Sequence, residues 1–117
     1  MKKRLRLARQ RDFQSTMEAP RLHAGRALVA FACRRSAQGS RVGVAVSRQL
    51  RGAVLRNRAR RRVREVVRSL LLAPDSVMVT AGIGYDVVLI ARPAALELPF
   101  SALEAEAAAL LARLARL

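Results

Sequence analysis

Two segments in the first half of the chain alternate between apolar and small or polar residues, with the period of two that is typical of β-strands. Residues 26–34 (RALVAFACR) place Ala27, Val29, Phe31 and Cys33 on one face and Leu28, Ala30 and Ala32 on the other. Residues 41–47 (RVGVAVS) place three valines on one face and small or basic residues on the other. The short, turn-rich segment 36–40 between them predicts an antiparallel hairpin.

Residues 53–72 have the period of a helix. Their apolar side chains recur three or four positions apart and form one stripe, which consists of Ala59, Val63, Val66, Val67, Leu70 and Leu71. Pro74 ends this helix. A second helix is expected to begin at Ser101, because Glu104 three residues later completes a capping box. Its apolar stripe consists of Leu103, Ala107, Leu110, Leu111, Leu114 and Leu117.

Three shorter segments complete the expected organisation. Asp12 can cap a short helix that runs to residue 17 or 18, with Phe13 on one of its faces. Pro20 and Gly25 bracket a loop. Residues 86–92 (DVVLIAR) contain five consecutive apolar residues, which indicates a strand covered on both faces.

A chain of 117 residues is the size of one domain, and 52% hydrophobic residues suffice for one core. We therefore expect a single domain over residues 1–117, with residues 1–11 as a flexible basic arm. No apolar run is long enough for a transmembrane helix, and no apolar segment follows the basic start as in a secretory signal. With Cys33 as the sole cysteine, a cytoplasmic protein is expected.

The charge is large and unevenly distributed. The net charge is +15, and 20 of the 23 Lys and Arg residues lie in residues 1–68 together with only 3 of the 8 acids. Such a field predicts a polyanionic partner. The residues for acid–base catalysis are few, because His23 is the sole histidine and the acids are scattered. We therefore expect no catalytic residue in this chain.

The predicted helix 53–72 concentrates this charge, because it carries seven arginines and a single acid, Glu65. Like charges one turn apart destabilise a helix, so the pattern favours a role in binding over a role in folding. Arginine matches phosphate oxygens with two parallel hydrogen bonds, and about seven phosphate contacts would give a salt-dependence slope of roughly −5 to −6. Asn57 within this run has two interpretations: a helix N-cap, or a contact to nucleic acid or to a hydrated metal ion.

Residues 41–68 also carry a pattern of motifs. They combine RVG (41–43), VS (46–47), AV (53–54), RNR (56–58), RR (60–61) and RE (64–65). Leu7 with Asp12 and Phe13 precedes this pattern, and DVVLIAR (86–92) followed by Pro93 and Ala94 comes after it. Together these motifs resemble the bacterial ribonuclease P protein family over nearly the whole chain.

The resemblance implies a fold and a function. The fold is α+β, a two-layer α/β sandwich of the ribosomal protein S5 domain 2 type, with the order α-β-β-β-α-β-α and a left-handed βαβ crossover. A third strand before the basic helix is then needed, and we expect it within or beside residues 41–47, or from a split of residues 26–34. The function is that of the protein subunit of ribonuclease P, an endoribonuclease that removes the 5′ leader of precursor tRNA. The family's catalytic RNA performs the reaction with Mg²⁺ that it binds itself, and no membrane or further protein partner is required.

The resemblance also implies the binding residues. Phe13, Phe31 and Arg48 match positions of the cleft that holds the single-stranded leader. The positions that meet the catalytic RNA are matched by Arg56, Asn57, Arg58, Arg60, Arg61, Arg64 and, one turn further along the same helix, Arg68. Asn57 is also the one candidate in this chain for a metal contact.

Other functions remain open from the residues alone. A ribosomal or general RNA-binding protein shares the charge pattern and needs no leader cleft. A DNA-binding module would need a second recognition element, which the sequence lacks. An autonomous nuclease is disfavoured by the few acid–base residues, and a membrane-surface helix over residues 103–117 is disfavoured because it has only two cations.

Overall fold

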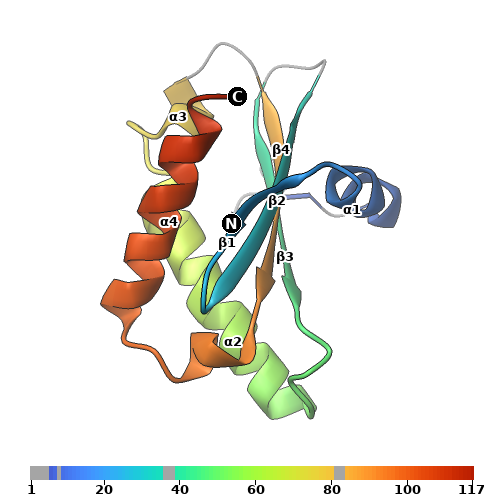
Figure 1. The fold of residues 1–117 in the computed structure, drawn as a ribbon, viewed down its shortest axis with the longest axis vertical. Coiled ribbons are helices and arrows are strands. Elements are labelled where there is room, and N and C mark those ends of the chain that lie inside the picture. The colour runs from blue at the N-terminus through green and yellow to red at the C-terminus, as the bar shows by residue number, and fades with distance from the viewer. Residues whose placement is uncertain (1–5, 8, 36–38, 81–83) are drawn as a thin grey trace.

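A four-stranded β-sheet divides the molecule, with one helix on one face and the longer helices on the other (Figure 1). The computed structural model describes residues 6–7, 9–35, 39–80 and 84–117. The elements in chain order are α1 (Gln10–Met17), β1 (Arg21–Ala24), β2 (Leu28–Arg34), β3 (Arg41–Val46), α2 (Ala53–Val66), a π-helical turn (Val67–Leu71), α3 (Val77–Thr80), β4 (Tyr85–Ala91), a 3₁₀ turn (Pro93–Leu96) and α4 (Phe100–Leu114). The α-β-β-β-α-β-α order is confirmed, with α3 and the two short turns as additions.

The strands are arranged in the order β1-β2-β4-β3. β4 pairs antiparallel with β2 and parallel with β3, and β1 pairs antiparallel with β2. The chain passes from β3 through α2 to the adjacent parallel strand β4, and this crossover is left-handed (Figure 1). Most crossovers of this kind are right-handed, so the hand follows the resemblance and departs from the general rule.

The predicted hairpin of residues 26–34 and 41–47 is wrong, because β4 lies between these two strands. Both strands exist as expected, but each is paired with β4. The reason is the apolar run of β4, in which six of seven residues are buried. A strand that is covered on both faces is stable only in the interior of a sheet.

The additional strand lies earlier in the chain than expected. β1 occupies residues 21–24, where Pro20 and Gly25 predicted a loop, and it forms the sheet edge beside β2. Buried His23 joins it to α4, since the ring Nε2 lies 2.8 Å from Glu106 Oε1. The Glu106 carboxylate also accepts the backbone N–H of Ala27 at 2.8 Å, which fixes the β1–β2 turn.

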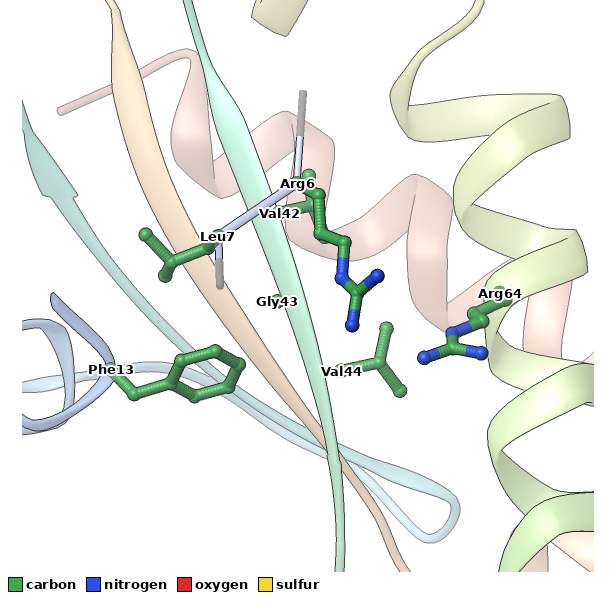
Figure 2. Close-up of a pocket in the computed structure, with 7 residues that line it drawn as sticks. All are labelled: Arg6, Leu7, Phe13, Val42, Gly43, Val44 and Arg64. Carbon is green, nitrogen blue, oxygen red and sulfur yellow. The ribbon is translucent and has the colours of Figure 1, made fainter. Parts of the chain in front are cut away.

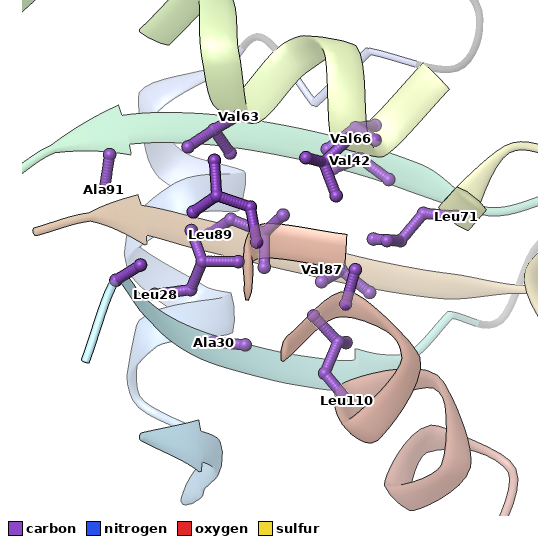
Figure 3. Packing of buried hydrophobic residues seen from close by; sticks show 14 of the residues in the cluster. Leu28, Ala30, Val42, Val63, Val66, Leu71, Val87, Leu89, Ala91 and Leu110 are labelled. Carbon is purple, nitrogen blue, oxygen red and sulfur yellow. The ribbon is translucent and has the colours of Figure 1, made fainter. Parts of the chain in front are cut away.

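The main core lies between the sheet and the pair α2 and α4 (Figure 3). Leu28 and Ala30 of β2 and Val87 and Leu89 of β4 meet the apolar stripes of both helices, so the two layers enclose one core. Five members of the predicted α2 stripe are fully buried, and Leu70 packs at its edge. In α4 the prediction fails at two points: the helix begins at Phe100 without a side-chain cap, and Leu117 is 45% exposed.

Two residues of the predicted basic arm lie against the sheet. Residues 1–5 and 8 of the predicted arm lie outside the described residues. Arg6 and Leu7, in contrast, run beside β3, where the Leu7 amide donates to the Val42 carbonyl at 3.0 Å and the Leu7 side chain is 1% exposed. α1 begins at Gln10, two residues before Asp12, so Asp12 lies in its first turn and is not its cap.

Among the described residues, no helix is both long and apolar enough to cross a lipid bilayer.

Candidate nucleic-acid interface

A small pocket opens at the edge of the sheet that β3 forms. It has a volume of about 70 Å³ and lies between the N-terminal segment, α1, β3 and one arginine of α2 (Figure 2). Its lining residues are Arg6, Leu7, Phe13, Val42, Gly43, Val44 and Arg64. We refer to it as the α1–β3 pocket. It therefore joins Phe13, predicted for the leader cleft, to Arg64, predicted for the arginine-rich helix.

The α1–β3 pocket has an apolar wall and a positively charged rim. Figure 2 shows the Phe13 ring on one side of β3 and the Arg6 and Arg64 side chains on the other side, with both guanidinium groups near Val44. Partial loss of solvent around its side chain, followed by the positive charges of Arg6 and Arg60, holds the pKa of Arg64 below its ordinary value. Neighbouring cations repel one another, and an anion that lies among them relieves this repulsion. This rim is therefore suited to a phosphate group next to an aromatic ring.

An ion-pair network fixes α1 over the sheet. Arg41 of β3 donates two hydrogen bonds to Asp86 of β4, at 2.9 and 2.8 Å, and reaches Asp12 of α1 at 3.3 Å. Its hydrogen bond to Asp86 is the main reason why the pKa of Arg41 lies above its ordinary value. Thr16, which is buried, approaches Cys33 Sγ of β2 to 3.8 Å near the other end of the helix. The position of Phe13 is thus set by contacts on both sides of it.

The arginines of α2 and of the π-helical turn that follows it form two groups according to their contacts. One group is directed to solvent: Arg58, Arg61, Arg64 and Arg68 are exposed, and Arg60 is partly exposed. Three of these line a second, open groove together with Glu65, namely Arg61, Arg64 and Arg68. Glu65 forms an ion pair with Arg68, and this hydrogen bond holds the pKa of Glu65 below its ordinary value. Most of the charge of this group is left for a polyanion.

The second group of arginines binds the chain's own backbone. Arg56 Nη1 donates to the carbonyls of Ser47 at 3.0 Å and Leu50 at 2.9 Å, in the connection between β3 and α2. Arg62 donates to the carbonyls of Ala95 at 2.6 Å and Leu98 at 2.8 Å, before α4. Arg56 was predicted as an RNA contact, but its guanidinium group already holds this connection together.

Asn57 lies inside α2, since the N-cap of the helix is Gly52. The N-cap interpretation is therefore wrong. Its Oδ1 accepts a hydrogen bond from Arg60 Nη1 at 2.9 Å. A single amide oxygen surrounded by arginines is a poor ligand set for Mg²⁺, which prefers several oxygen ligands that include carboxylates. Nor do the described residues hold a cluster of three or more His, Cys, Asp or Glu side chains that could bind a metal.

The other two predicted cleft residues lie outside the α1–β3 pocket. The strand register puts Phe31, Val88 and Gly43 in one row across the sheet. Phe31 is therefore on the same face as Phe13 and is partly exposed there. Arg48 is exposed in the β3–α2 connection that Arg56 holds. The three predicted residues share a face and its border, but only Phe13 lines the pocket.

Sequence reasoning missed two parts of the pocket. Arg6 and Leu7 line the pocket but lie in the segment that the sequence predicts as a flexible arm. An apolar residue such as Leu7 within a basic segment is a sign of burial, which could have indicated their position. Gly43 belongs to the face of residues 41–47 that carries small or basic residues. The group that approaches it is the ring of Phe13 from the same chain.

The chain matches one protein family over nearly its whole length. The family model described as "Ribonuclease P" matches residues 1–115. A ribonuclease P protein component of Symbiobacterium thermophilum is 46% identical over 101 residues, which cover 86% of this chain and 82% of the relative. The corresponding protein of Chloroflexus aurantiacus is 38% identical over 112 residues, which cover 95% of this chain and 78% of the relative.

Solved structures agree with this match. The RNase P protein of Thermotoga maritima superposes with a TM-score of 0.71 at 26% identity, covering 92% of this chain and 96% of that one. An RNase P protein mutant of Staphylococcus aureus with defective mRNA degradation activity gives a TM-score of 0.73 at 27% identity, covering 97% of this chain and 90% of that one.

Proposed function

The chain belongs to the ribonuclease P protein family, and we propose that it acts as the protein subunit of a cytoplasmic ribonucleoprotein that removes the 5′ leader of precursor tRNA. In this role it binds the catalytic RNA and holds the single-stranded leader. The product is tRNA with a mature 5′ end.

One observation carries this proposal beyond family membership. The α1–β3 pocket brings an aromatic ring together with two arginines of separate segments, Arg6 and Arg64. Single-stranded nucleic acid is bound in this way in general, because a base stacks on the ring while cations bind the backbone phosphates. Stacking needs no particular base, which suits leaders of differing sequence.

The two surfaces that meet at Arg64 then have different functions. The sheet face beside α1, with Phe13, Phe31 and the neighbouring Arg48, holds the leader. The solvent-directed arginines of α2 bind phosphates of the catalytic RNA, with Asn57 among them. Arg64 belongs to both surfaces, since it lines the α1–β3 pocket and the open groove of α2. The leader is thereby held next to the RNA that cleaves it.

In this proposal the chemistry belongs to the RNA. Mg²⁺ bound by the RNA activates water for hydrolysis of the phosphodiester bond. The ligand set at Asn57 does not fit a resident Mg²⁺ ion, so we assign no metal step to this chain. The contribution of the protein is binding: contacts made to the leader, and absent from mature tRNA, favour the precursor over the product.

The experiment is a comparison of two affinities of the reconstituted ribonucleoprotein. Equilibrium binding is measured with a precursor tRNA that carries a leader and with the same tRNA without it. One stacked base and one phosphate contact predict a preference for the precursor of at least about tenfold. Equal affinities would contradict the proposal and favour a ribosomal or general RNA-binding protein.

A further inference from the structure

At Gly43 the Phe13 ring of α1 lies directly against the sheet. It lies in β3, paired with Val88, and it is buried. A Cβ atom built on Gly43 would lie 2.4 Å from Cζ of Phe13, and 2.8 and 2.9 Å from the two Cε atoms. Carbon atoms that are not bonded do not approach so closely, so the Phe13 ring occupies the space of the absent side chain.

The backbone does not explain this glycine. The positive φ angles among the described glycines belong to Gly39 and Gly52, so the conformation of Gly43 is open to any L-residue. A glycine inside a strand also weakens the strand, because it adds no packing and loses more entropy on folding. The requirement at position 43 is therefore one of space, and the space is filled by Phe13.

The ring could not avoid a methyl group at position 43 through a simple shift of its helix. Asp12, the residue before Phe13, is bound to Arg41 at 3.3 Å, and Thr16 approaches Cys33 one turn later. The ring would then have to turn about its own side-chain bonds, and this ring forms part of the wall of the pocket that Arg6 and Arg64 also line. A methyl group at position 43 would therefore change the shape of this wall.

We propose that Gly43 is a positioning residue for leader binding: its missing side chain allows the tip of the Phe13 ring to lie against β3 and holds the ring in the wall of the pocket that Arg6 and Arg64 also line. The inference rests on the proposed function, because it concerns the same pocket. It adds a residue that contacts no RNA and acts through Phe13 alone.

A double-mutant cycle tests this dependence. Gly43→Ala, Phe13→Ala and the double variant are reconstituted with the catalytic RNA, and the preference for precursor over leaderless tRNA is measured for each. Each single variant is expected to lower the preference by at least about fivefold, the lower end of the range for one lost stacking contact. The double variant should be no weaker than Phe13→Ala, because without the ring the methyl group has nothing to displace. Ala45→Gly is the matched control, since it changes one methyl group two residues along the same strand, and it should leave the preference unchanged.

The outcomes separate the inference from the proposed function. Losses that multiply in the double variant, or a silent Gly43→Ala beside an impaired Phe13→Ala, would overturn the role of Gly43 and leave leader binding at Phe13 intact. A silent Phe13→Ala would overturn both. Gly43→Ala could show no cooperative unfolding transition, which would mean that this variant does not fold. In that case, a cooperative transition in the double variant supports the inference, and its absence there overturns the inference.

Discussion

The arginines of α2 look alike in the sequence, but their guanidinium groups have different tasks. Arg56 and Arg62 donate to carbonyl groups of two connections, at distances of 2.6 to 3.0 Å. Arg61 and Arg58 are exposed. Helical periodicity predicts which side of a helix is buried, and it predicted the α2 stripe correctly. It does not reveal which arginine meets a carbonyl, because that depends on the path of connections distant in the sequence.

This division predicts different effects for two substitutions of the same kind. Arg56→Ala should lower the free energy of unfolding by about 1–2 kcal/mol, because it leaves carbonyls of the β3–α2 connection without their donor. Arg61→Ala should leave the free energy of unfolding within about 0.5 kcal/mol of the wild type, because its side chain is exposed. Urea denaturation followed by circular dichroism measures both. A smaller effect for Arg56→Ala than for Arg61→Ala would show that the grouping is wrong.

At the scale of elements, the sequence predicted most of the helices and strands but not which strands pair in the sheet. The strands around residues 28–34, 41–46 and 85–91 follow from alternation or from an apolar run. The prediction erred in pairing β2 with β3, because short connections favour hairpins. The central place of β4 was already implied by its burial on both faces. β1 was missed because four residues containing Arg and His give no apolar pattern, and its stability comes from contacts of His23 and the β1–β2 turn with Glu106.

The attachment of α1 predicts a local effect on dynamics. Asp12→Asn removes the charge that pairs with Arg41, at a site between the helix and the sheet. We expect faster amide hydrogen exchange in α1 and a global stability within about 1 kcal/mol of the wild type, because the pair is partly exposed and the main core lies on the other face. Exchange measured by mass spectrometry reports both regions. Glu18→Gln, at the other end of the helix, is the control, and equal exchange in the two variants would contradict a role of Asp12 in holding α1.

At the scale of the whole molecule, the fold separates a core face from a binding face. α2 and α4 enclose the main core on one side of the sheet, whereas α1 leaves part of the other side accessible (Figure 1). α2 belongs to both, since its Val63 and Val66 are buried and its Arg64 lines the α1–β3 pocket. The charge pattern predicted a polyanionic partner, but the hand of the crossover came from family resemblance, because local sequence does not determine it. The pocket depends on Arg6 and Arg64 meeting across 58 positions of the chain, which no motif spacing shows.

The most direct test of the central claim is a cleavage assay on a precursor tRNA at low Mg²⁺ concentration. It compares the protein alone, the catalytic RNA of the same organism alone, and the two together. We predict that the protein alone is inactive and that the pair releases the leader at the mature 5′ end much faster than the RNA alone, because protein contacts to the leader and to the RNA replace part of the screening that Mg²⁺ provides. Cleavage that is unchanged by the protein, despite tight RNA binding, would contradict its role as this subunit.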